Sequence, residues 1–148
     1  MAKLKANDVS AKLEQPKNTL ILGCDSIFEI DGQALGKPHT PKIALERILE
    51  MSGKSGVLHT GYALNLEGRQ VSSVCSTVVN FEHFSEQEAK AYVQTGEPLE
   101  VAGSFTIDGR GAALISSIEG DYHNVVGISP NQLRHLMRQL DLEYVELW

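Results

Sequence analysis

Apolar positions recur along the chain with two different spacings, which predict alternating helices and strands. Spacing of three or four residues predicts helices in the opening segment to about residue 14, from residue 40 to 53, from 85 to 96, and after residue 129. Continuous or alternating apolar runs predict strands at residues 19–24, 27–30, 33–35, 57–66, 70–81 and 112–118.

Capping and turn residues mark the ends of these elements. Thr40-Pro41 and Ser129-Pro130 each combine a capping side chain with proline at the first helical position. Ser85-Glu86-Gln87-Glu88 has the sequence of a capping box, in which the first and last side chains satisfy each other's free backbone donors. Asp31-Gly32 predicts a tight hairpin, and Pro16 predicts the end of the opening helix.

The order of the elements predicts the fold class. Helices and strands are interleaved, whereas the strands at 57–66 and 70–81 are joined by the short turn Glu67-Gly68-Arg69 and predict an antiparallel pair. We therefore expect an α/β protein with a mixed, twisted sheet flanked by helices. The length of 148 residues predicts a single domain spanning 1–148.

Composition and charge narrow the classes of partner. The net charge of −6 argues against a nucleic-acid backbone or an anionic membrane as partner, because both require a dense basic surface. Cys24 and Cys75 match no zinc spacing and are expected to be buried, reduced thiols. The N-terminus lacks the apolar core of a signal peptide and no run reaches transmembrane length, so we expect a cytoplasmic protein.

The candidate chemistry begins at Gly23-Cys24-Asp25-Ser26, after the apolar run at 19–22. An acid where a buried strand opens into a loop, with Lys37 a short turn later, is a common arrangement of a phosphate-handling site. Structural alternatives remain: Asp25 could simply end a strand, Lys37 could be a solvated turn residue, and Asp108 before Gly109 could only form a turn. Gly53-Lys54-Ser55 lacks the earlier glycine of a P-loop and follows a helix.

Several motifs in order along the chain resemble the Maf family of nucleoside triphosphate pyrophosphatases, related to the inosine triphosphatase-like enzymes. The matching segments are Lys5-Ala6, Gly23-Cys24-Asp25-Ser26, Leu35-Gly36-Lys37-Pro38, His59-Thr60-Gly61, the helix end Thr95-Gly96-Glu97-Pro98-Leu99, Ala102 to Ile107, and Glu119 to Gly127. The resemblance covers nearly the whole chain. It implies the Maf/inosine triphosphatase-like fold.

The resemblance also implies a reaction. Members hydrolyse nucleoside triphosphates between the α- and β-phosphates, which gives a nucleoside monophosphate and pyrophosphate and removes non-canonical or excess nucleotides. The opening strand and Ser-x-x-Arg loop of the family have no counterpart in residues 1–148, so we expect an N-terminally truncated form. The alternative hypothesis is an inactive nucleotide-binding or cell-division regulatory protein.

Residue roles follow from the same resemblance. Asp25 matches the proton acceptor for water, and an ordinary Asp, which titrates near about 4, needs help in that role. A divalent cation, Mg²⁺ or Mn²⁺, held in part by Asp25, would acidify bound water. The implied substrate-binding residues are Lys5 and Lys37 toward phosphate, Ser26 and Asp108 toward the base, and Asp121 and Asn124, which could instead brace a loop.

Two further properties are left open by the sequence. Ser26 with Asp108 matches neither the pyrimidine nor the modified-guanosine pattern of the family, so the preferred nucleobase is undecided. The edge left by the unmatched opening strand would favour pairing, which makes a homodimer one expectation.

Overall fold

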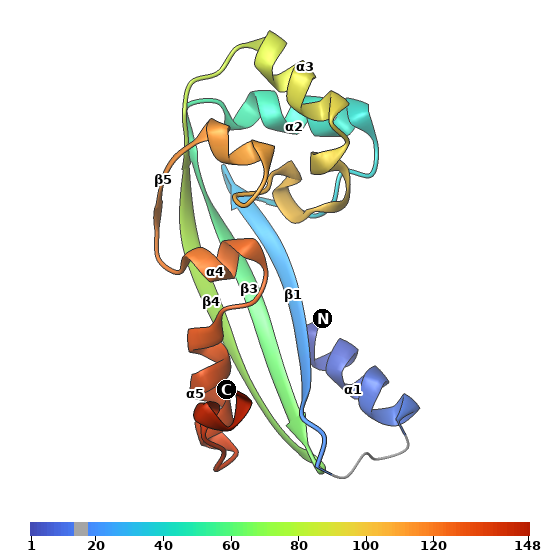
Figure 1. The fold of residues 1–148 in the computed structure, drawn as a ribbon. Helices are drawn as coiled ribbons and strands as arrows, with labels where there is room; N and C mark the ends of the chain where they lie inside the picture. Colours follow the sequence, from blue (N-terminus) through green and yellow to red (C-terminus); the bar gives the residue numbers. More distant parts are fainter. Residues whose placement is uncertain (14–17) are drawn as a thin grey trace. The chain divides into compact units, whose positions relative to one another are not determined.

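The computed structural model describes residues 1–13 and 18–148 and contains a five-stranded sheet with the order β2-β1-β3-β4-β5 (Figure 1). The strands are β1 (Ile21–Ile30), β2 (Gln33–Leu35), β3 (Ser55–Leu66), β4 (Arg69–Phe81) and β5 (Ile115–Glu119). The α-helices are α1 (Ala2–Lys12), α2 (Pro41–Met51), α3 (Glu86–Gln94), α4 (Tyr122–Val126) and α5 (Pro130–Gln139). No helix among the described residues is long and apolar enough to cross a bilayer.

The predicted α/β class with flanking helices is confirmed, and the expected mixed sheet is found as an antiparallel one. β1 pairs antiparallel with β2, and β4 pairs antiparallel with β5. β3 and β4 form a hairpin through Glu67 and Gly68, whose φ angles of 47° and 83° suit a tight turn. Helix α2 connects β2 to β3, but β1 lies between these two strands and runs opposite to both, so neighbouring strands are antiparallel (Figure 1).

The chain divides into two compact units, and each is described by itself. The first unit comprises Met1–Asp25, Thr60–Cys75 and Ile128–Trp148, and the second comprises Ser26–His59 and Ser76–Gly127. The first unit therefore contains α1 and α5, and the second contains α2, α3, α4, β2 and β5.

The first unit has its main core beneath α5. The Ser129 side chain caps this helix by accepting a hydrogen bond from Gln132 N, as the Ser-Pro sequence predicts. The capped helix then buries Leu136 and Met137 against Tyr62 and Leu64 of β3. A smaller cluster forms where α1 packs on β1 and β3, through Ala2, Ala6, Ile21 and Ala63.

The second unit is built around three phenylalanines. Phe28, Phe81 and Phe105 pack edge to face, with ring centroids 5.0 to 6.0 Å apart. A neighbouring cluster joins α2 to α3, and both predicted helix starts are confirmed: Thr40 caps α2 and the Ser85/Glu88 capping box begins α3. The predicted stop of the opening helix at Pro16 lies outside the described residues.

Two predicted element boundaries are wrong. The strands expected at residues 19–24 and 27–30 are one continuous strand, β1. The strand expected at 112–118 begins only at Ile115, because residues 110–114 form a 3-10 helix. Hydrogen bonds from the backbone of Arg110 and Gly111 to the Glu97 carboxylate hold that segment away from the sheet.

Candidate active site

Asp25 lies in the middle of β1 and not where a strand opens into a loop. This corrects the sequence-based placement, because the extended backbone continues through Ser26 and Ile27. Successive side chains of a strand point to opposite faces, so Asp25 and Ser26 are directed to opposite sides of the sheet. The two candidate residues therefore meet different surroundings.

Lys5 of α1 forms an ion pair with Asp25 in the first unit. The Lys5 Nζ atom also donates a hydrogen bond to the Cys24 carbonyl oxygen, at 3.2 Å. The side chains of Lys5 and Asp25 are 52% and 34% exposed, so the pair is open to water. The structure thus brings together two of the predicted site residues, one cationic and one anionic, at a solvent-accessible position.

Gly23 makes this pairing possible. A Cβ atom at Gly23 would lie 2.4 Å from the Ala2 carbonyl oxygen, 2.8 Å from Ala6 N and 2.9 Å from Ala6 Cβ. Only glycine allows the α1 backbone to approach β1 so closely. This close packing places Lys5, one turn along α1, over the carboxylate of Asp25.

The thiol of Cys24 lies next to Asp25 and near the Lys5 charge. Burial raises the pKa of Cys24, and the nearby Lys5 charge acts in the opposite direction without overcoming it. Cys24 is half-buried and has a free thiol, and Cys75 is buried. Cys24 is therefore a protonated packing residue at neutral pH, beside the carboxylate but without a nucleophile's low pKa.

Ser26 and Asp108 line one cavity in the second unit. Its volume is 160 Å³, and its lining residues come from β1, β3, the 101–108 segment and the end of α4: Ser26, Leu58, Val101, Ala102, Phe105, Thr106, Asp108, Val125, Val126 and Gly127. The structure therefore brings together the two residues predicted to contact the base. The volume is below the about 300 Å³ usual for a whole small-molecule site, so it suits one part of a ligand.

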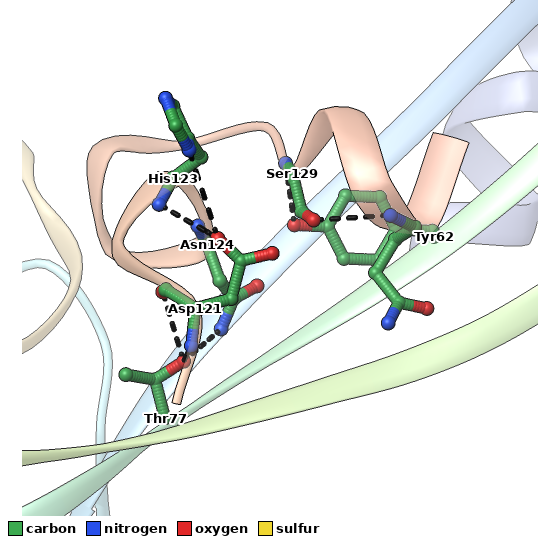
Figure 2. A network of polar contacts seen from close by, with 7 residues as sticks. Tyr62, Thr77, Asp121, His123, Asn124 and Ser129 are labelled. Carbon is green, nitrogen blue, oxygen red and sulfur yellow. Dashed lines mark hydrogen bonds and ion pairs between the residues drawn. The ribbon is translucent and has the colours of Figure 1, made fainter. Parts of the chain in front are cut away.

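Asp121 and Asn124 brace the start of α4 in the second unit (Figure 2). The Asp121 carboxylate caps the helix by accepting hydrogen bonds from His123 N at 2.8 Å and Asn124 N at 3.3 Å. The Asn124 amide is fully buried and donates to Thr77 Oγ1 at 3.2 Å, and that hydroxyl donates to the Asp121 carbonyl oxygen at 3.1 Å. These contacts are those of a loop brace; substrate binding by either residue stays a prediction.

We expect Asn124→Ala to lower the free energy of unfolding by about 2 to 3 kcal/mol, because it removes a buried polar partner of Thr77 and leaves a void. Chemical denaturation with urea measures this loss. His123→Ala, at an exposed position of the same helix, is the matched control and should change stability by less than about 0.5 kcal/mol. Equal stabilities for the two variants would contradict the bracing role.

Lys37 is exposed on the loop between β2 and α2. Its Nζ atom lies 3.8 Å from Glu100 Oε2, and both side chains are more than half exposed, so this ion pair is weak and leaves the cation accessible. The loop is held by Arg47 Nη1, which donates to the Gly36 carbonyl oxygen at 2.8 Å. Among the described residues, the lining of the Ser26 and Asp108 cavity does not include Lys37.

Glu97 is a further candidate near the Asp108 segment, and the sequence motifs do not single it out as a site residue. Its carboxylate accepts hydrogen bonds from Thr106 Oγ1, Arg110 N and Gly111 N, the latter two at 3.0 Å. Desolvation by burial acts to raise the pKa of Glu97, but these hydrogen bonds outweigh it and lower the pKa to about 2. The signal for Glu97 in the sequence is its place in Thr95-Gly96-Glu97-Pro98, one of the segments that carry the family resemblance.

The donor set bears on a possible metal ion. Within residues 1–13 and 18–148, no cluster of three or more His, Cys, Asp or Glu side chains is arranged to hold a metal. Mg²⁺ bound together with substrate phosphates needs only one or two protein carboxylates, since water and phosphate oxygens complete its shell. Asp25, whose side chain is one-third exposed, fits that single-carboxylate role.

The fold is that of an α/β protein, and a partly exposed Lys5–Asp25 ion pair lies where α1 packs against the glycine of β1. The chain matches the model of the family described as Maf-like protein over residues 1–140. It therefore belongs to the Maf family, which confirms the resemblance seen in the sequence.

Similar proteins bear informative names. A protein of Salinispora tropica is 47% identical over 152 residues, and one of Streptomyces coelicolor is 46% identical over 150 residues; both are named nucleoside triphosphate pyrophosphatase. Each alignment covers 100% of this chain. It covers 67% of the Salinispora tropica protein and 72% of the Streptomyces coelicolor protein. A Bifidobacterium longum protein named nucleoside triphosphate pyrophosphatase/Nudix hydrolase fusion protein is 47% identical, over 87% of this chain and 27% of that protein.

Proposed function

We propose that this chain is a hydrolase that converts nucleoside triphosphates to nucleoside monophosphates and pyrophosphate, and so removes non-canonical or excess nucleotides. The observation that carries the proposal is the Asp25 carboxylate, held on β1 by Lys5 at a water-accessible position. Membership of the Maf family and the names of relatives up to 47% identical support it. Water would attack the α-phosphorus while the bond to the β-phosphate oxygen breaks and pyrophosphate leaves.

Asp25 would orient the attacking water and receive its proton. Lys5 holds the carboxylate in place through the ion pair, and it offers an ammonium group to phosphate oxygens. Lys37, exposed and weakly paired, would contribute a second cation to the phosphates. Ser26 and Asp108 would contact the base through the 160 Å³ cavity, whose size suits that part of the nucleotide.

A divalent cation, Mg²⁺ or Mn²⁺, belongs to the same proposal, with Asp25 as its protein ligand. When bound with the triphosphate, such an ion neutralises phosphate charge and acidifies water. This role fits the exposed Asp25 carboxylate and the net charge of −6, which otherwise repels a polyanionic substrate. A cytoplasmic location, homodimer formation and the lack of nucleic-acid or membrane partners stay predictions.

The direct test is a panel of canonical and modified nucleoside triphosphates, assayed for pyrophosphate release with Mg²⁺, with Mn²⁺ and with EDTA. We expect pyrophosphate and nucleoside monophosphate in equal amounts, and release that stops in EDTA. Inorganic phosphate with nucleoside diphosphate would place the cleavage at the wrong bond. Binding without turnover of any member of the panel would contradict the proposal and support an inactive nucleotide-binding protein.

A further inference from the structure

Asp108 lies on a segment that has no regular secondary structure, and this segment is fixed at its two ends. Residues 105–109 form neither helix nor strand, and Asp108 is exposed near their end. Thr106 before it and Arg110 and Gly111 after it all donate hydrogen bonds to the carboxylate of Glu97. One side chain therefore closes the base of the loop that presents Asp108.

Hydrogen bonds join Glu97 to the end of α3. Glu97 lies three residues beyond the end of α3, and its N–H donates a hydrogen bond to Oγ1 of Thr95, the C-cap of that helix, at 3.2 Å. The same Thr95 hydroxyl donates to the Tyr92 carbonyl oxygen at 2.7 Å. The backbone of Glu97 is thus joined through Thr95 to a helix that buries Tyr92 and Val93.

Tyr92 adds a second attachment to the loop. Its hydroxyl oxygen accepts a hydrogen bond from Thr106 N at 3.1 Å. Burial raises the pKa of Tyr92 to about 12, helped by the negative charge of Glu97 and opposed by the Thr106 hydrogen bonds, so the phenol remains protonated. Tyr92 of α3 therefore holds the backbone N–H of Thr106, and Glu97, beyond the end of that helix, holds the Thr106 hydroxyl.

The glycines of the loop fit closely around this anchor. A Cβ atom at Gly109 would lie 2.7 Å from Glu97 Oε1, and one at Gly111 would lie 2.4 Å from the Thr106 carbonyl oxygen and 2.6 Å from the Tyr92 hydroxyl. A larger residue at Gly109 would displace the Glu97 side chain, and one at Gly111 would meet the Thr106 backbone and displace the loop. The segment Gly109-Arg110-Gly111 thus packs closely against the Glu97 carboxylate and donates hydrogen bonds to it.

We propose that Glu97 is a positioning residue of the nucleotide site, which acts through the Thr106–Gly111 loop to hold Asp108 at the cavity that it shares with Ser26. This inference rests on the proposed function, because it concerns how well the base of the substrate is held. Glu97 does not line the cavity, so it acts on the substrate only through the position of Asp108.

The chemistry of the anchor requires a carboxylate. Three donors converge on its two oxygens, and both oxygens of an ionised acid can accept. Glutamine has nearly the same shape, but its amide nitrogen can only donate and would face an N–H or O–H donor. The pKa of about 2 means that Glu97 stays ionised at every pH where an assay is practical.

The test compares Glu97→Gln with Glu86→Gln in pyrophosphate release and thermal unfolding. Glu86 is a matched control, because it is an exposed acid of α3 that pairs with Lys90 one turn later. We expect Glu97→Gln to raise KM about tenfold or more and to reduce the discrimination between nucleobases. We expect kcat to change less than threefold. Glu86→Gln should leave all three unchanged.

A double-mutant cycle separates positioning from general stabilisation. If Glu97 acts through Asp108, Glu97→Gln should add little to KM once Asp108→Asn is present. Additive effects of the two substitutions, or a lower melting temperature with KM and base preference unchanged, would overturn the proposal and leave Glu97 a structural residue.

Binding of an α,β-imido nucleoside triphosphate keeps the inference testable apart from turnover. If the wild-type chain binds this analogue but releases no pyrophosphate from any nucleoside triphosphate of the panel, the proposed reaction fails. Weaker binding of the analogue by Glu97→Gln than by Glu86→Gln would then still support the positioning role. Equal Kd values for wild type and both variants would overturn it. A wild-type chain that shows neither binding nor turnover would overturn both proposals.

Discussion

Replacing Asp25 with Asn should reduce pyrophosphate release by about 10²- to 10⁴-fold, the range typical for loss of a general base. The substitution keeps the shape of the side chain and its reach toward Lys5, but it removes the negative charge and the ability to accept a proton. Because the ion pair is partly exposed, its loss should cost only about 0 to 1 kcal/mol of stability. Initial rates at saturating substrate, together with a thermal melt, measure both effects.

Asp31→Asn provides the matched control. Asp31 also pairs with a lysine, Lys54 Nζ at 2.6 Å, and it lies at the tip of the β1–β2 hairpin with a φ of 51°, which asparagine tolerates well. This control removes the same charge and the same kind of ion pair without touching the proposed site. Activity close to that of the wild type in both variants would exclude Asp25 as the proton acceptor. A large fall in both variants would indicate a general effect of charge.

Local signals in the sequence were sufficient for the helix starts and the main hairpins. Thr40, Ser85 and Ser129 each cap a helix as predicted, because a cap is decided by contacts within three residues. The pairing of residues around Glu67 and Gly68 follows for the same reason. The motifs on which the family resemblance depends also lie mostly within such short segments.

The sequence was less informative where a contact joins distant residues. Asn124 is braced by Thr77, 47 positions earlier, and Glu97 holds the backbone of Arg110 and Gly111, 13 and 14 positions later. Apolar spacing alone predicted strand from residue 112, because it carries no information on the carboxylate that captures those backbone donors.

The position of Asp25 shows the same limit on a smaller scale. Polar residues at 25 and 26 suggested a loop, since they interrupt an apolar run. The structure keeps both in β1, where Lys5 from α1 provides a partner for the acid. The decisive residue is Gly23, whose missing side chain admits that helix, and a glycine in a strand indicates only that some backbone comes close, without saying which.

Replacing Gly23 with Ala should therefore damage both stability and activity. The new Cβ would meet the Ala2 carbonyl oxygen and the Ala6 backbone, so α1 must shift outward. Overpacking of this kind costs about 1 to 3 kcal/mol, and each kcal/mol lowers the melting temperature by about 2 to 4 °C in a chain of this size. Displacement of α1 also separates Lys5 from Asp25, and we expect at least a tenfold loss of pyrophosphate release.

Gly61→Ala is the control for this substitution, because it adds the same methyl group on neighbouring β3. Its Cβ would lie 3.6 Å from Ala2 Cβ and 3.9 Å from the Asp25 carbonyl oxygen, which are ordinary contacts. If Gly23→Ala lowers activity by separating Lys5 from Asp25, then adding Lys5→Ala to this variant should lower activity little further. Lys5→Ala alone should lower activity strongly. Equal melting temperatures and rates for the two alanine variants would contradict the packing of α1 on Gly23. A full additional loss from Lys5→Ala in the Gly23→Ala background would show that Lys5 still reaches its partner, and the effect of the methyl group would then be on stability alone.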